Sequence, residues 1–236
     1  PVFEQVVDTL RHSGHPTQVY ERGPASFAST SALTFDDYLT ARPHAFRASL
    51  DGADRALLGA GRASFRLIVD ETDIGAASRD FKRIVEQRDD AGSSETPRYL
   101  PGLMSVAARS GVLRLGFLDV DGEPAAAQMW VISSGIAHCL SIVSVADHDN
   151  PLLDDLLTAR LARHLIDIDR VVELDYGTVT TEFARNWASG SRRRVGVIAF
   201  NPRTWRGVKG TVRHIAIPKM LSIPRRLLRK LARFGA

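Results

Sequence analysis

The sequence predicts a mixed α/β fold in which helices flank a central sheet, and three observations support this. Three apolar runs follow one another between residues 113 and 145, and Asp121-Gly122 separates the first two, which is a strong hairpin signal. A helical segment then leads to another apolar run at 171–177, as in a crossover to a neighbouring strand. Finally, 236 residues with 44% hydrophobic content are enough for a sizeable core.

The elements before residue 98 follow from apolar spacing and from capping residues. The expected elements are a helix at 2–14, a strand at 17–22, a polar loop rich in Ala and Ser, a helix capped by Thr34, a helix opened by Pro43, a strand at 64–70 and a helix at 73–87. Residues 88–97 contain a single apolar side chain, Ala91, so we expect a loop or an internal boundary there.

The elements after residue 98 alternate more regularly. The expected elements are a short helix at 99–111, strands at 112–120, 123–133 and 135–145, a helix at 152–169, a strand at 171–177, a short helix at 180–187 and a strand at 193–200. Asn150 and Pro151 are typical of a helix start, with Asn as the cap and Pro at the first helical position.

Cysteine usage and hydropathy limit the class of protein. Cys139 is the single cysteine, which excludes an internal disulfide framework and a Cys-based zinc site and favours a reducing compartment. No apolar run approaches the roughly 20 residues that span a bilayer, and no signal peptide is evident. We therefore expect a cytoplasmic protein. We also expect no metal, because the Asp147-His148-Asp149 stretch has no further His or Cys nearby.

The net charge of +4 is unevenly distributed. Residues 218–236 hold six Lys and Arg and no acid, so the rest of the chain sums to −2. Within 219–236, leucines and a phenylalanine fall on one helical face and basic residues on the other, which predicts an interfacial helix at the inner face of an anionic membrane. A helix packed on the body or on a partner is the alternative, and nucleic-acid binding is disfavoured because the body is acidic.

Three phrases in the sequence carry a family resemblance. LRLGFLDVDGEPAAAQMWVISSG, LLTARLARHLIDIDRVVELDYG and GVIAFNPRTWRG resemble the CelD-like, polysaccharide-associated branch of the GNAT acyltransferases, which is related to the Fem-type transferases. The resemblance implies a GNAT-like domain at 61–215. It further implies that residues 1–60 are a partial GNAT-like segment with a helical linker, and that 216–236 form a basic amphipathic tail.

The resemblance also implies a mechanism and a set of site residues. An acyl-CoA donor would lie where the strand ending near Val145 splays from the strand ending at Tyr176, and an amine or hydroxyl of a saccharide or cell-envelope acceptor would attack it. The implied donor-binding residues are Ile142, Val143, Ser144, Val145, Asn150 and Leu152. Asp175 and Tyr176 are implied as catalytic, and the implied acceptor-binding residues are Glu182, Arg185, Trp187, Gln128 and Trp130.

Several residues depart from the family pattern and keep alternatives open. The turn before residue 152 has no glycine, and Asp147, Asp149, Asp154 and Asp155 surround it. These acids could complement the helix dipole or could repel a pyrophosphate. A Tyr-Lys pair of the family is replaced by Phe183 and Ala184.

Structural roles also compete with the implied functional ones. Glu182 and Arg185 could form an ion pair, Trp130 and Trp187 could be core residues, and Asp175 could cap a helix. His138, His164 and His214 have no evident catalytic partners in the sequence. The sequence therefore predicts an acyltransferase, with a catalytically degenerate binding or scaffold module at the membrane as the alternative.

Overall fold

The computed structural model describes residues 2–88, 99–145 and 152–216. The chain divides into two compact units, one formed by residues 24–192 and the other by residues 1–23 together with 193–236. The predicted boundary after residue 60 falls inside the larger unit, so the compact units follow a different division from the one that the sequence suggests. The interpretation of 1–60 as part of another GNAT-like half stays a prediction.

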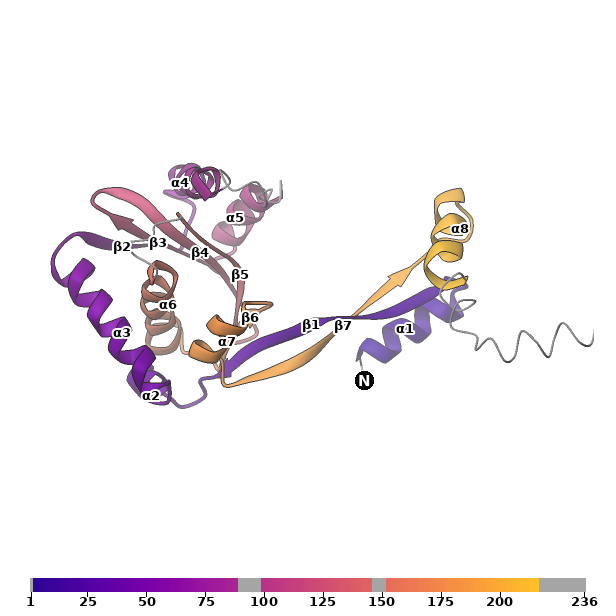
Figure 1. The fold of residues 1–236 in the computed structure, drawn as a ribbon. Helices are drawn as coiled ribbons and strands as arrows, with labels where there is room; N and C mark the ends of the chain where they lie inside the picture. The colour runs from indigo at the N-terminus through magenta and orange to yellow at the C-terminus, as the bar shows by residue number, and fades with distance from the viewer. Residues whose placement is uncertain (1, 89–98, 146–151, 217–236) are drawn as a thin grey trace, which may run out of the picture. The chain divides into compact units, whose positions relative to one another are not determined.

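The larger unit has a mixed α/β architecture, as predicted (Figure 1). Its helical elements are α2 (Phe35–Thr40), α3 (His44–Asp54), the π-helical η1 (Arg55–Gly59), α4 (Ile74–Arg88), α5 (Leu100–Arg109), α6 (Leu153–Arg163), the π-helical η3 (His164–Ile168) and α7 (Thr181–Trp187). Its strands are β2 (Ala63–Ile68), β3 (Leu113–Val120), β4 (Glu123–Ser133), β5 (Ile136–Ser144) and β6 (Glu173–Gly177). Parts of β1 (Thr17–Ser29) and β7 (Gly190–Ala199) complete a sheet in the order β2-β3-β4-β5-β6-β1-β7.

Helices cover both faces of this sheet (Figure 1). On one face, α4 and α5 enclose an apolar cluster that includes Phe81, Leu115 and Met129. On the other face, α2, α3, α6 and α7 pack over a cluster that includes Trp130 and Leu174. Strands β3, β4 and β5 therefore supply side chains to two separate cores, which is why their apolar runs in the sequence are nearly continuous.

Local signals place most elements where the sequence predicts them. Asp121 and Gly122 both have positive φ, 51° and 87°, as a tight hairpin turn between β3 and β4 requires. Thr34 caps α2 and shares a capping box with Asp37. The predicted start of α6 is corrected, because its first helical residue is Leu153; Asn150 and Pro151 lie outside the described residues.

Two predictions of secondary structure need correction. β1 continues to Ser29 through the segment predicted as a polar loop, since residues 26–29 pair with β6. That partner lies about 150 positions away, so no local pattern reveals it. Helix α8 (Trp205–Thr211) is not among the predicted elements, although Thr204 accepts a hydrogen bond from the backbone N–H of Gly207 as a helix cap.

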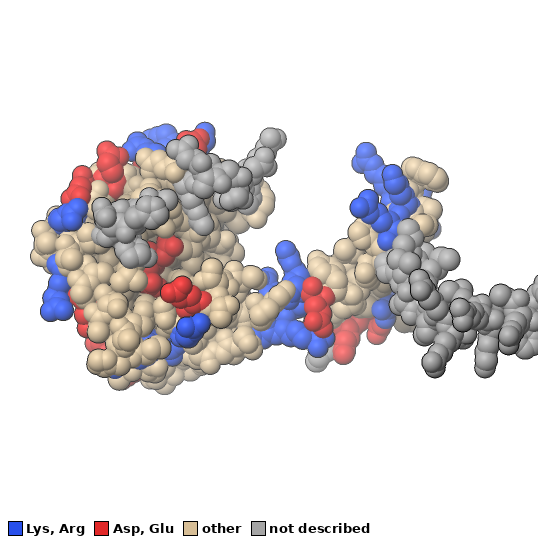
Figure 2. Space-filling view, viewed as in Figure 1, with Lys and Arg blue, Asp and Glu red and all other residues tan. Residues whose placement is uncertain are grey.

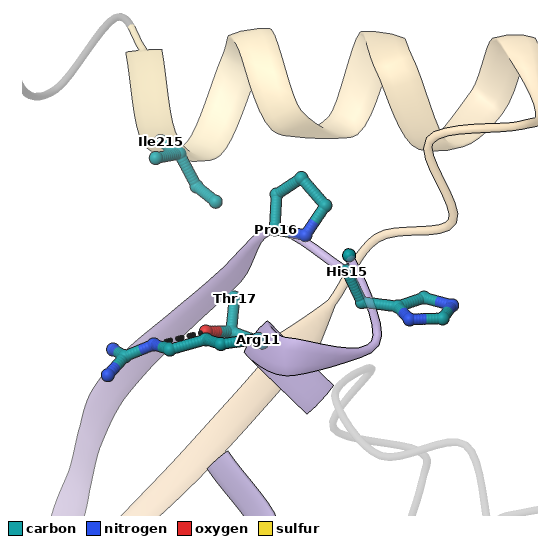
Figure 3. Close-up of a pocket in the computed structure, with 6 residues that line it drawn as sticks. Arg11, His15, Pro16, Thr17 and Ile215 are labelled. Carbon is teal, nitrogen blue, oxygen red and sulfur yellow. Dashed lines mark hydrogen bonds between the residues drawn. The ribbon is translucent and has the colours of Figure 1, made fainter. Parts of the chain in front are cut away.

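The smaller unit contains α1 (Val2–His12), the first part of β1, most of β7, α8 and the π-helical η4 (Val212–Ala216). A hollow of about 500 Å³ lies between α1 and η4, where Arg11 donates a hydrogen bond to Thr17 (Figure 3). None of the predicted site residues lines it. Over the described ranges, no helix is both long and apolar enough to cross a membrane.

Candidate active site at the opening of the sheet

Strands β5 and β6 separate after a short paired stretch. They run parallel and pair at Ile136–Glu173, Ala137–Leu174 and His138–Asp175. β5 then continues to Ser144, still paired with β4, while among the described residues no strand pairs with its other edge. The predicted splay between these strands is confirmed, and it leaves an open edge along the second half of β5.

The backbone groups on this open edge follow from strand alternation. The N–H of Val145 donates to Ala125 on β4. In an antiparallel pair the N–H groups of successive residues point to opposite edges, so those of Ser144 and Ile142 face away from β4. A bulge lies between these residues and the paired stretch, because Ser141 and Cys139 oppose consecutive β4 residues and leave Leu140 unmatched. The edge thus offers unpaired donors beside a local distortion.

The N-terminus of α6 lies just beyond this edge in the chain. Leu152 occupies the cap position and, within the described part of the chain, makes no side-chain capping hydrogen bond. The start of a helix favours anions through its N–H groups and its dipole. Donor binding by Leu152 and Ser144 stays a prediction. Asn150, Asp147 and Asp149 belong to the part of the chain that the structure does not describe.

Asp155 in the first turn of α6 is turned toward the core. Its Oδ1 accepts a hydrogen bond of 2.6 Å from the indole N–H of Trp187. Burial raises the pKa of Asp155 to about 6, the Trp187 hydrogen bond opposes that shift, and the charges of Asp154 and Glu182 add to it. This carboxyl group therefore braces α7 against α6 and does not face an anion at the helix end.

A polar cluster lies where β5 and β6 begin to separate. Nδ1 of His138 is 3.4 Å from Oδ2 of Asp175, and the two side chains are 38% and 21% exposed. Oδ2 also lies 3.5 Å from Nη2 of Arg192, which in turn forms an ion pair with Glu173. The Arg192 guanidinium stacks over the ring of Phe27. The sequence alone does not reveal this contact, because residue 175 lies beside His138 only in the folded sheet.

Asp175 is held firmly in this cluster. Its Oδ1 accepts a hydrogen bond of 2.9 Å from the N–H of Gly177. The suggestion that it caps the following helix is wrong, since Thr180 performs that role by accepting from the N–H of Phe183. Tyr176 faces the opposite side of β6, as strand alternation predicts, and is buried.

Tyr176 belongs to an aromatic group that fixes α7. Its hydroxyl lies 2.8 Å from that of Tyr38, which also donates to the carbonyl of Trp187. Arg42 donates to the same carbonyl and lies over the Tyr38 ring. Burial raises the pKa of Tyr176 well above its usual value, so the phenol stays protonated. Trp187 is fully buried, and the direct roles predicted for Tyr176 and Trp187 stay predictions.

Gln128 and Trp130 form a buried network between β4 and α6. The amide of Gln128 donates to Thr158 and to the carbonyl of Asp154, and its oxygen accepts from the Trp130 indole. Both side chains are completely buried. These hydrogen bonds fix the position of α6 on the sheet. Acceptor binding by Gln128 and Trp130 stays a prediction.

The remaining predicted residues differ in exposure. Glu182 and Arg185 are exposed on α7, where the structure records no ion pair between them among the described side chains. Ile142 and Val145 are half-buried, and Val143 is buried against α4 and α5. Burial raises the pKa of the Cys139 thiol. In the described ranges, no group of His, Cys, Asp or Glu is arranged to hold a metal ion.

A mixed sheet that opens between β5 and β6, with α6 beginning beyond the opening, is consistent with the fold of the GNAT acetyltransferases. The model of the acetyltransferase (GNAT) domain matches residues 44–185, and the chain belongs to that family. A search of curated proteins finds no match.

Solved structures share this fold at low sequence identity. One is the C-terminal domain (DUF2156) of an Agrobacterium fabrum protein described as a lysylphosphatidylglycerol synthetase, with a TM-score of 0.59, 12% identity and coverage of 88% of this chain and 69% of that one. L-PGS from Bacillus licheniformis matches with a TM-score of 0.57 and 10% identity, over 85% of this chain and 66% of that one. FemX matches with a TM-score of 0.57 and 8% identity, over 82% of this chain and 67% of that one. This chain spans about two thirds of the length of each of these neighbours.

Proposed function

We propose that the chain transfers an acyl group from acyl-CoA to an amine or hydroxyl of a saccharide or cell-envelope acceptor. The observation that carries this proposal is the open edge of β5, where no strand among the described residues pairs with the N–H groups of Ile142 and Ser144. Such groups can donate to a thioester carbonyl or to the pantetheine amides. The uncapped start of α6 supplies a complementary site for the pyrophosphate. Placement within the CelD-like branch rests on the quoted phrases and is part of the same proposal.

The turned-in carboxyl group of Asp155 favours this function over a degenerate module. A carboxylate facing the helix end would repel phosphate, but this one is engaged by Trp187. The glycine-free turn between β5 and α6 remains the feature of the sequence that supports the alternative. Acyl-CoA binding separates the two.

The test is calorimetric titration of the full chain with acetyl-CoA, together with the variants Ser144→Pro and Ser144→Ala. Proline removes the N–H that faces the open edge without removing a β4 ladder bond, whereas alanine keeps that N–H and removes only the hydroxyl. We expect Ser144→Pro to weaken binding at least tenfold and Ser144→Ala to bind like wild type. Absence of wild-type binding at millimolar acetyl-CoA would favour the degenerate module.

We further propose that the C-terminal part of the chain rests on an anionic membrane. All 27 acidic residues lie at or before Glu182, and the residues after it hold 14 of the 31 Lys and Arg. Within this stretch α8 exposes Trp205, which is 81% exposed, beside Arg206 and Lys209. Figure 2 shows basic side chains gathered on this helix. A Trp among cationic residues suits the lipid headgroup region.

Co-sedimentation with vesicles tests this placement. We expect the chain to co-sediment with phosphatidylglycerol vesicles and not with phosphatidylcholine vesicles. Trp205→Ala should weaken binding, and a chain ending at Pro218 should weaken it further, whereas Tyr99→Ala, at an exposed aromatic of the larger unit, should not. Equal binding by all variants would contradict the proposal.

A further inference from the structure

We infer that His138 accepts the proton of the attacking nucleophile and that Asp175 positions its imidazole; this inference rests on the acyl transfer proposed above. Nδ1 of His138 faces Asp175, which leaves Nε2 as the atom that can take up a proton. The imidazole is 38% exposed, so an acceptor can reach it.

The position of His138 along β5 suits this role. It forms the last register pair before β5 and β6 separate, and the bulge residue Leu140 follows two positions later. The N–H of Ile142, the nearer of the two proposed donors, follows four positions after His138 along β5. The imidazole therefore lies at the closed end of the open edge along which the thioester would be bound.

Charged groups surround His138. Asp175 is fixed by the N–H of Gly177 on one oxygen, so the other oxygen is presented to His138. Arg192 bridges Glu173 and Asp175. A carboxylate is thus held against Nδ1, which orients the imidazole with Nε2 directed away from Asp175.

In the proposed reaction the acyl group passes directly from CoA to the acceptor. The nitrogen or oxygen of the acceptor attacks the thioester carbonyl carbon, its proton passes to Nε2 of His138, and the new bond forms to carbon. The C–S bond then breaks, and its electron pair leaves on the CoA thiolate, which takes the proton from the imidazolium. Acyl-CoA and the acceptor are the two reactants, and free CoA and the acylated acceptor are the products.

A second His–Asp contact in the same unit provides a matched control. Nε2 of His164 lies 3.5 Å from Oδ2 of Asp169, almost the separation found at His138. Asp169 is additionally engaged by Arg114 in a close ion pair. His164 follows the C-terminal end of α6, the end opposite to the one beside the open edge.

The experiment compares His138→Gln, His138→Ala and His164→Gln in the full chain, with steady-state kinetics and acetyl-CoA titration. We expect both substitutions of His138 to lower kcat roughly 10²- to 10⁴-fold, with the Kd for acetyl-CoA unchanged within a factor of two. Added imidazole should restore part of the activity of His138→Ala, and His164→Gln should behave like wild type. If kcat falls without imidazole rescue, or does not fall, the inference is overturned.

Asp175→Asn tests the positioning role separately. The amide keeps an oxygen for the Gly177 N–H but presents a donor to His138, which favours the wrong tautomer. We expect a lower kcat with an unchanged KM for acetyl-CoA, and no rescue by imidazole, because the native imidazole is still present. A wild-type chain that binds no acetyl-CoA would overturn the proposed function, whereas normal binding and turnover in His138→Gln would overturn only this inference.

Discussion

Two strand pairs of the central sheet, β3–β4 and β5–β6, differ in how far they pair. β3 and β4 pair through eight residue positions, and the side chains between them, including Leu115 and Leu118, are fully buried. β5 and β6 pair through three, and the side chains at their junction are charged and partly exposed. Complete pairing produces core, whereas interrupted pairing leaves backbone donors and titratable groups within reach of solvent. The sheet thus holds its fully packed strands and its candidate site within one layer.

The largest effect on the packed β3–β4 pair is expected from Trp130→Ala. This side chain is fully buried, donates to Gln128 and packs edge-to-face on Tyr176. Removing it should lower the free energy of unfolding by about 3–5 kcal/mol, measured by urea denaturation. Trp130→Phe, which keeps most of the volume, should cost much less, and equal costs for the two variants would show that packing does not dominate here.

A pH dependence is expected where α6 meets α7. The pKa of Asp155 is raised in the folded state to about 6, so the native state binds a proton more tightly than the unfolded chain. Stability from this group is therefore present near pH 4 and is lost as the pH rises toward 6, with a change on the order of 2 kcal/mol.

Asp155→Asn tests this pH dependence. The asparagine keeps an acceptor for the Trp187 indole but cannot ionise. Urea denaturation of the variant should show a flatter stability profile between pH 4 and 6 than the wild type does. Parallel profiles for the two proteins would assign the effect to other groups.

A smaller effect is expected from Tyr38→Phe. The substitution removes the hydrogen bonds to Tyr176 and to the Trp187 carbonyl, although Arg42 still donates to that carbonyl. We expect a loss of about 1–2 kcal/mol in the free energy of unfolding. Tyr99→Phe is the control, because its ring is 68% exposed, and it should change stability little.

The smallest effect on stability is expected from an exposed ion pair next to the β3–β4 pair. Arg83 and Glu123 form an ion pair at 2.8 Å, with side chains 53% and 76% exposed. Arg83→Ala should change the free energy of unfolding by less than about 1 kcal/mol, since exposed pairs are screened by solvent. A larger loss at 0.5 M salt, where screening is stronger, would contradict this reasoning.

Features with local causes could be predicted from the sequence. The Asp121-Gly122 hairpin, the Thr34 cap and the helical spacing of α4 each depend on neighbours along the chain, and each is found as predicted. The end of β1 depends on pairing with a strand far along the chain, so its apparent loop composition was misleading. Local spacing cannot report such a partner.

The candidate site shows the same limit. Asp175 was identifiable as the acid at a strand end, but His138 is 37 residues earlier and meets it only through parallel pairing. Asp155 looked like an obstacle to phosphate until the indole of Trp187 fixed its direction. In both cases the sequence shows the residue type, but only the folded structure shows the residue that it contacts.

The insertion of β1 beside β6 has a consequence for folding kinetics. Phe27 pairs with Asp175, and the Thr30 hydroxyl donates to the carbonyl of Val171. Contacts of such sequence separation close long loops and are formed slowly. During synthesis β1 cannot pair with β6 until the chain has been made as far as residue 177. Until that closure, the nascent chain carries an unprotected strand edge, and chaperones would be needed most at that moment.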